Sequence, residues 1–278
     1  MPSLFAKKER GEKISWLTCY DFPFAQLMDQ AGVEMILVGD SAAMTVHGHK
    51  GTLPITMDEM ISHSKAVVRG APHCFVIGDM PFMSYQISVE EAIRNAGRFM
   101  KEGGCDAIKL EGGRRVTPMV RGIVDAGIPV IGHIGLTPQS SSMLGGARIQ
   151  GKTAASARAL VDDAKALAEA GAFAILLELI PTPVSDAIMK AVPDLLIFGI
   201  GAGPVCHGQL VIMHDLIGLF QAFQPKFVKK YVNISEIVER AFEQYVREVK
   251  DRTFPAKENE YEIDPKEIGK LKKMLKKA

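Results

Sequence analysis

The sequence lacks the features that are typical of nucleic-acid-binding, membrane and secreted proteins. Its 278 residues include 33 basic and 32 acidic side chains, so there is no basic excess of the kind that nucleic-acid binding requires. No run approaches the roughly 18 to 20 apolar residues of a membrane span, and the apolar stretch near the amino terminus is too short for a signal peptide. The four cysteines form no CxxC pair, which is typical of a reducing compartment. We expect a cytoplasmic protein that acts on small molecules, without nucleic-acid or membrane partners.

Eight short, nearly continuous apolar segments are present instead, and most are followed by a segment with helical patterning. Such segments are typical of parallel strands that are buried on both faces. The chain is also close in length to the roughly 250 residues of one (β/α)8 barrel. We predict an α/β fold, a single TIM barrel over residues 1–255, with an open doubly wound sheet as the alternative. The strand-like segments lie at residues 14–21, 35–40, 74–81, 107–113, 129–135, 173–181, 195–203 and 209–215.

The composition changes near the carboxyl end of the sequence. No Ser/Gly/Pro-rich linker interrupts residues 1–250, but the chain after residue 254 is strongly charged and ends in IGKLKKMLKKA. On a helix, Ile268 and Leu271 would belong to one apolar stripe, with lysines such as Lys277 on the other side. We therefore predict that residues 256–278 form a charged tail that can be helical.

Four carboxylates end or follow these apolar segments: Asp40, Asp79, Glu111 and Glu178. In a parallel α/β domain the carboxyl ends of all strands open onto one face, so these distant residues are expected to converge. Acids that share one pocket repel one another unless a cation lies between them or some stay protonated. Asp40 and Asp79 suit a hard cation such as Mg²⁺, which prefers oxygen ligands. The pattern favours a divalent-metal enzyme.

Three other features of these strand ends indicate roles in catalysis or binding. Lys109 lies two residues before Glu111, so both side chains point to one face of a strand, where the lysine can pair with an anionic substrate or with those acids. His133 can donate a hydrogen bond to a substrate oxygen or occupy a core position. Glu178 lies among apolar residues, which favours a general base; a buried structural glutamate is the alternative.

The sequence also resembles one enzyme family over residues 10 to 255. It contains, in order, TCYDFPFAQLMDQAGVEMILVGDS, HGHKGTLPITMDEMISHSKAV, GDMPFMSY, IKLEGG, GHIGLTPQS and GIGAG. Together these segments resemble the ketopantoate hydroxymethyltransferases (3-methyl-2-oxobutanoate hydroxymethyltransferases). The resemblance implies a (β/α)8 barrel related to the phosphoenolpyruvate mutase and isocitrate lyase group. It also implies Mg²⁺-assisted transfer of a one-carbon unit from 5,10-methylenetetrahydrofolate to 3-methyl-2-oxobutanoate, which gives 2-dehydropantoate for pantothenate biosynthesis. A homodecamer is implied as well.

The resemblance assigns roles to particular residues of this chain. It implies the metal ligands Asp40, Asp79 and Glu111, the substrate contacts Asp40, Ser41, Asp79, Lys109 and His133, and the catalytic base Glu178. The sequence departs from many members of the family at two places. Ala42-Ala43 replaces Leu-Gly beside the metal site, and His207 stands where members usually carry aspartate. We expect the change at His207 to alter folate or subunit contacts.

Two other functions fit the same residues and remain as alternatives. The first is a Mg²⁺-dependent lyase of the phosphoenolpyruvate mutase group that acts on another α-keto acid. The second is a barrel that binds a metabolite without turnover, against which the intact acids argue. Divalent cations other than Mg²⁺ are compatible with either enzyme.

Overall fold

The computed structural model describes residues 1–223 and 225–276. The chain divides into two compact units, Met1–Tyr231 and Val232–Ala278. The boundary between barrel domain and charged tail at residue 255 stays a prediction. Among the described residues, no helix combines the length and the apolar character that a membrane crossing needs.

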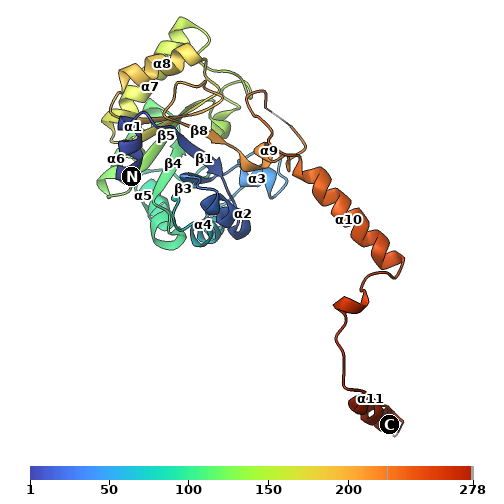
Figure 1. The fold of residues 1–278 in the computed structure, drawn as a ribbon. Coiled ribbons are helices and arrows are strands. Elements are labelled where there is room, and N and C mark those ends of the chain that lie inside the picture. Colours follow the sequence, from blue (N-terminus) through green and yellow to red (C-terminus); the bar gives the residue numbers. More distant parts are fainter. Residues whose placement is uncertain (224, 277–278) are drawn as a thin grey trace. The chain divides into compact units, whose positions relative to one another are not determined.

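The first unit is a closed barrel of eight parallel strands, with β1 hydrogen-bonded to both β2 and β8. The (β/α)8 prediction is therefore confirmed, and the open doubly wound sheet is excluded. Figure 1 shows the strands surrounded by helices. The strands are β1 (Ile14–Thr18), β2 (Met35–Val38), β3 (Phe75–Asp79), β4 (Ala107–Glu111), β5 (Val130–Gly135), β6 (Ala174–Glu178), β7 (Leu196–Ile200) and β8 (Gly208–Val211).

The outer layer consists of helices that follow the strands in sequence. The six longer ones are α2 (Phe22–Gln30), α4 (Met57–Gly70), α5 (Val89–Arg98), α6 (Thr117–Asp125), α7 (Ala154–Glu169) and α8 (Thr182–Ala191). The short α3 (Ala42–Thr45) and α9 (Met213–Leu216) follow β2 and β8, whereas no helix separates β7 from β8. This unit also contains a short π-helix, η1 (Phe99–Gly103), and two 3₁₀ helices, η2 (Arg114–Val116) and η3 (Pro138–Ser140).

The interior of the barrel changes character along the strands. Alternate residues of a strand point to the same side, and on β4 the inward series is Ala107, Lys109 and Glu111, all buried. The apolar members belong to a buried cluster in which Trp16 packs edge-on against Phe198, with ring centroids 5.0 Å apart. The inward side chains are thus apolar in the middle of the barrel and charged at the carboxyl ends of β3 to β6.

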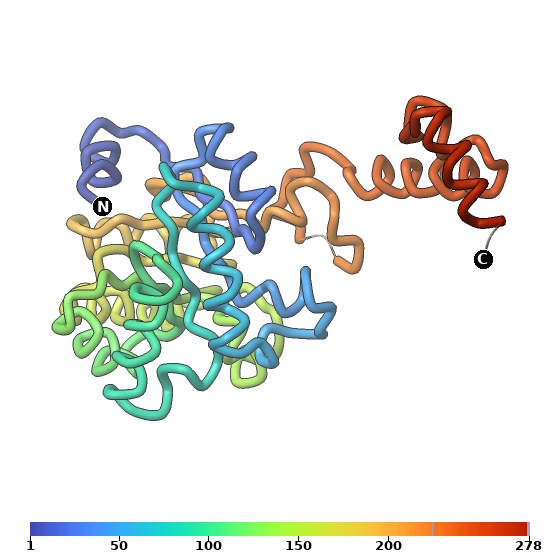
Figure 2. Tube along the Cα trace, turned by 90° about the horizontal axis from the view of Figure 1, so that it is seen from below, coloured from blue at the N-terminus to red at the C-terminus, as the bar shows by residue number. Residues whose placement is uncertain are grey.

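The amino-terminal helix α1 (Pro2–Glu9) lies against the other end of the barrel. Leu4 is buried in the same cluster as Trp16. The Lys8 ammonium donates to the carbonyl of Leu195, just before β7, at 3.1 Å. In Figure 2 this helix is seen beside the segments that enter β7 and β8. It covers the end of the barrel opposite the charged residues.

His207 lies at this opposite end, directly before β8, and its Nδ1 accepts the backbone N–H of Ile197 at 2.9 Å. Its effect on folate or subunit contacts stays a prediction, and the strand ends that carry the acids are at the other end of the barrel. Burial, followed by the positive charges of Lys8 and Lys13, lowers the pKa of His207 from 6.5 to about 4. The imidazole is thus neutral at physiological pH and supplies an acceptor, as an aspartate would.

We predict that His207 makes the folded state less stable in mild acid. An unfolded chain takes up a proton at this side chain below pH 6.5, whereas the folded chain does so only near pH 4, so stability falls as the pH falls between these values. His207→Asn keeps an acceptor but does not titrate, so its midpoint of thermal unfolding should fall less steeply over this window. His49→Asn, at an exposed histidine, serves as the control. Identical slopes in wild type and His207→Asn would contradict the assignment.

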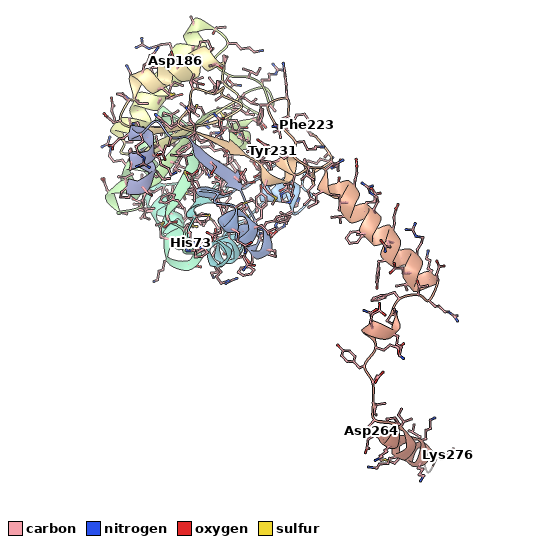
Figure 3. The ribbon with its side chains drawn as sticks, in the orientation of Figure 1. His73, Asp186, Phe223, Tyr231, Asp264 and Lys276 are labelled. Carbon is pink, nitrogen blue, oxygen red and sulfur yellow. The ribbon has the colours of Figure 1, made fainter. Side chains whose placement is uncertain are left out.

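The second unit contains α10 (Ile234–Lys250), η4 (Lys257–Asn259) and α11 (Pro265–Leu275), and none of their residues is buried. Asp264 caps α11 by accepting the N–H of Lys266 at 2.8 Å. Figure 3 shows Asp264 and Lys276 at the two ends of this helix. Helix α10 exposes large apolar side chains, among them Phe242. Lys277, which we expected on the basic face of α11, lies outside the described residues.

Candidate active site

The three acids predicted as metal ligands are all buried at the carboxyl ends of neighbouring strands. Asp79 and Glu111 are the last residues of β3 and β4, and Asp40 lies two residues beyond β2. The backbone N–H of Asp40 donates to Asp79 Oδ2 at 3.1 Å, which joins the first two directly. The structure therefore brings together the acids that the strand-end pattern selected.

Lys109 is the cation closest to these acids. Its ammonium donates to both carboxylate oxygens of Asp79, at 2.8 and 3.0 Å, and lies 3.4 Å from Glu111 Oε1. Burial lowers the pKa of this lysine, but the neighbouring carboxylates Asp79 and Glu111 raise it by more. Lys109 is therefore protonated. Of the two roles that the sequence allows for it, pairing with the acids is present in the structure.

One lysine does not balance the buried acids. Burial and the charge of Asp79 raise the pKa of Asp40 well above its usual value, and burial also raises the pKa of Asp79. The pKa of Glu111 is lowered in spite of burial, because Lys109 and His133 lie beside it. With all groups ionised, Asp40, Asp79 and Glu111 exceed Lys109 by two negative charges, and this excess has to be offset by protons or by a cation.

His133 and Glu178 face each other at the ends of β5 and β6. His133 Nε2 lies 3.1 Å from Glu178 Oε2, and Nδ1 lies 3.5 Å from Glu111 Oε1. Neither contact meets the geometry of a hydrogen bond, so we interpret both as charge contacts. Burial and Lys109 lower the pKa of His133, but Glu111 and Glu178 raise it to about 9. A buried imidazole without a hydrogen bond is unusual, and it is suited to receive a ligand oxygen.

The backbone holds Glu178 in place. Gly135, its partner across β5 and β6, has φ +98°, and a Cβ there would lie 2.2 Å from the carbonyl oxygen of Glu178. Leu179 has φ +48°, which is rare for a branched side chain. Its N–H and carbonyl are bonded to Ile200 and Gln150. Only 16% of the Glu178 side chain is exposed, so the carboxylate lies at the mouth of the barrel rather than in bulk water.

Ser41 lies beside the acids but contacts a different group. Its Oγ is 2.8 Å from the hydroxyl of Tyr20, which in turn donates to Thr18 Oγ1 at 2.8 Å. Ser41 also precedes α3, in which Ala42 and Ala43 are fully buried. The two small residues that depart from the family pattern therefore pack inside the buried core.

Sequence reasoning missed two residues that connect the acids. Gln139, in η3, donates from Nε2 to Asp40 Oδ2 at 3.0 Å and from its backbone N–H to Glu111 Oε2 at 3.0 Å. The Tyr85 hydroxyl donates to Gln139 Oε1 at 2.7 Å and accepts the N–H of Glu111 at 3.1 Å. Both residues lie in segments that carried the family resemblance, GHIGLTPQS and GDMPFMSY, and this was the available signal.

The donor set fits a magnesium-like ion with few protein ligands. In the described part of the chain, no three His, Cys, Asp or Glu side chains are arranged to hold an ion by themselves. Mg²⁺, however, is usually held by one or two carboxylates together with waters and substrate oxygens. The adjacent carboxylates of Asp40 and Asp79, in a cluster that carries two excess negative charges when ionised, suit that kind of site. The oxygens of Asp79 already contact Lys109, and those of Glu111 contact Lys109, His133 and Gln139. The roles of Asp40, Asp79 and Glu111 as direct ligands stay predictions.

The fold and the site together define a (β/α)8-barrel protein with a cluster of buried acids at the carboxyl ends of its strands. The chain is similar in structure to phosphonopyruvate hydrolase, solved in complex with oxalate and Mg²⁺, with TM-score 0.60 and 14% identity over 99% of this chain and 95% of that one. It is similarly related to 2,3-dimethylmalate lyase, with TM-score 0.60 and 16% identity over 99% and 96% of the two chains. At these identities the likeness shows the fold alone.

Sequence comparison identifies the family. The model of the ketopantoate hydroxymethyltransferase family matches residues 1–257. The 3-methyl-2-oxobutanoate hydroxymethyltransferase of Moorella thermoacetica is 54% identical over 94% of this chain and 97% of its own length. That of Alkaliphilus metalliredigens is 55% identical over 94% and 92%. The chain belongs to the ketopantoate hydroxymethyltransferase family, and the protein is therefore a transferase, as predicted.

We predict that Gln139 helps to hold Asp40 and Glu111 in position for metal binding. Gln139→Met keeps a similar length but removes the side-chain donor to Asp40 and the acceptor of Tyr85. Hydrogen bonds to charged groups contribute about 1.5–3 kcal/mol, so the Mg²⁺ concentration for half-maximal activity should rise roughly tenfold or more. Gln26→Ala, at an exposed position on α2, is the control. An unchanged Mg²⁺ requirement in a folded Gln139→Met protein would refute this role.

Proposed function

We propose that the protein transfers a hydroxymethyl group to 3-methyl-2-oxobutanoate, using 5,10-methylenetetrahydrofolate as the co-substrate and Mg²⁺ as the metal. The product, 2-dehydropantoate, would enter pantothenate biosynthesis. The observation that carries this proposal is the convergence of Asp40, Asp79, Lys109, His133 and Glu178 at one barrel mouth in a chain that belongs to this family. Other divalent cations suit the same oxygen ligands.

The proposed ligands divide between the metal and the keto acid. Asp40 and Asp79 would hold the ion directly, with Glu111 in contact through its own oxygens or through water. When bound, Mg²⁺ would supply Lewis-acid stabilisation of the negative charge that develops on the keto oxygen. Lys109 offers a positive charge to the substrate carboxylate, and Ser41 offers its hydroxyl beside Asp40.

The chemistry requires removal of the C3 proton of the keto acid. Glu178 is the proposed base, since its carboxylate is held at the mouth of the barrel and lies beside His133. The unbonded nitrogens of His133 can donate to an oxygen of the substrate. The carbanionic C3 then takes the one-carbon unit of the folate: one carbon–carbon bond forms, and both bonds from that carbon to N5 and N10 of the folate break. Water supplies the hydroxyl oxygen of the product, and tetrahydrofolate leaves with the C3 proton and the second proton of water on its two nitrogens. No covalent enzyme intermediate is needed, because the folate provides the electrophile.

Neither alternative is favoured. A lyase of the phosphoenolpyruvate mutase group has structural support only, at 14–16% identity, whereas the transferases match at about half of all positions. A barrel without activity would not need four acids and a lysine gathered at one mouth. Dependence of product formation on folate separates the first alternative from the proposal, and turnover separates the second.

The location and assembly of the protein belong to the same proposal. A cytoplasmic location follows from the unpaired cysteines, all four of which are free and buried. A homodecamer follows from the family resemblance, and the exposed apolar face of α10 supplies surface for subunit contacts. Ten chains of 30.2 kDa give a particle of about 300 kDa, and a monomeric mass in light scattering would contradict this assembly.

Glu178→Gln should separate binding from proton transfer. The amide preserves size but cannot accept the C3 proton, and a general base contributes about 10²–10⁴-fold. With saturating keto acid and Mg²⁺ in D₂O, but without folate, wild type should exchange the C3 proton, and the variant should exchange it slower by about that factor. Glu169→Gln, at the end of α7, is the matched control. Equal exchange in wild type and Glu178→Gln would assign the base to another group, with His133 the first to test.

A further inference from the structure

A cavity of about 520 Å³ lies beside the proposed reaction centre. It is lined by residues that directly follow the site residues on two strands: Gly112 follows Glu111, and Ile134 follows His133. Successive side chains of a strand point to opposite faces, so this cavity lies on the helix side of β4 and β5. It approaches the proposed chemistry at the rim of the barrel, where Gly113 and Gly135 also line it. Helix α7 and the loop after η3 form its other walls. Its volume is in the range of small-molecule sites, about 300–1,000 Å³.

One side of the cavity carries a cation without an anionic partner. The guanidinium of Arg115, an exposed residue, donates hydrogen bonds to Ser140 Oγ and Met143 Sδ, and in residues 1–223 and 225–276 it forms no ion pair. Its neighbour Arg114, in contrast, is paired with Asp163 at 2.9 Å. A guanidinium binds a carboxylate through two parallel hydrogen bonds. Arg115 therefore suits an anionic end of a ligand.

The rest of the cavity is suited to an aromatic body. Ile134, Leu144 and Leu160 line it together with Met143, and sulfur and aliphatic side chains make favourable contacts with aromatic rings. A ligand for this cavity would thus have an anionic end at Arg115 and an apolar ring between the walls. Its remaining part would lie towards Glu111 and His133, where the transferred carbon is needed.

We propose that this cavity binds the p-aminobenzoyl-glutamate half of the folate co-substrate, with Arg115 paired to a glutamate carboxylate. This inference rests on the proposed function, which calls for a folate but does not say where it binds. The pterin ring, which carries the one-carbon unit, then extends past the end of β5 to the mouth of the barrel. The keto acid and the folate approach Glu178 from different sides.

Calorimetric titration with tetrahydrofolate tests the role of Arg115 without turnover. Arg115→Ala should raise the Kd about ten- to a hundredfold, the usual range for a charge-assisted pair, and Arg115→Lys should lie between this variant and wild type. Tetrahydropteroate, which lacks the glutamate, should bind wild type and Arg115→Ala equally. Arg121→Ala, an arginine on α6 outside the cavity, should match wild type with both ligands. Equal loss of both ligands in Arg115→Ala would overturn the glutamate pairing.

A second variant tests the cavity itself. Ala159 lines it from α7, and Ala159→Leu keeps a good helix former while filling part of the space, so it should weaken both ligands. Tetrahydrofolate affinity equal to wild type in Arg115→Ala and Ala159→Leu would overturn the proposal, as would failure of wild type to bind tetrahydrofolate. Exchange of the C3 proton of the keto acid needs no folate. Its absence in wild type would refute the proposed function instead, so the two failures are distinguishable.

Discussion

The structure depends on a buried excess of negative charge at the carboxyl ends of β2, β3 and β4. Asp40, Asp79 and Glu111 are almost wholly inaccessible to water, and one buried ammonium, that of Lys109, pairs with Asp79 and Glu111. Buried charges are costly unless they are paired. The surrounding residues reduce this cost, since the backbone N–H groups of Asp40 and Gln139 and the side chain of Gln139 all donate to these acids. The remaining charge suits a divalent cation and an anionic substrate.

The barrel tolerates these buried charges because the residues that stabilise the fold are different from those that form the site. The apolar middle of the barrel, with Trp16 and Phe198, and the buried layer beneath the helices provide a core that the acids do not interrupt. The charged residues lie towards the carboxyl ends of β3 to β6 and just beyond β2, with Lys109 one inward position before Glu111. Glu178 is more exposed than the other acids because it lies at the rim of the barrel, where a base can reach both a substrate and solvent. In this fold the strand ends can therefore vary while the core stays the same.

Much of this arrangement could be predicted from the sequence, because two sequence patterns determine it. Apolar runs of strand length indicated eight strands, and a period of two put Lys109 and Glu111 on one face. The convergence of Asp40, Asp79 and Glu111 followed from the common direction of parallel strands. Pattern reasoning failed where position depends on a loop. Gln139 reaches the acids from a turn after β5, and no periodicity predicts that approach.

Other features required coordinates for different physical reasons. The placement of His207 depends on which end of a strand it occupies, and a departure from a family pattern does not reveal this. The left-handed backbone of Leu179 is imposed by bonds to Ile200 and Gln150, both distant in sequence. The unpaired charge of Arg115 likewise emerges only when every neighbouring carboxylate is located. The division after Tyr231 has no linker composition to mark it.

The central claim is that the buried acids bind a divalent cation, and Mn²⁺ binding measured by electron paramagnetic resonance without substrate tests it most directly. Mn²⁺ accepts the same oxygen ligands as Mg²⁺ and is visible by this method. The account predicts one ion per chain in wild type, displaced by excess Mg²⁺, and severe weakening in Asp40→Ala and Asp79→Ala. Asp186→Ala, at a half-exposed acid on α8, should bind as wild type does. Undiminished Mn²⁺ binding in folded Asp40→Ala and Asp79→Ala proteins would contradict the account.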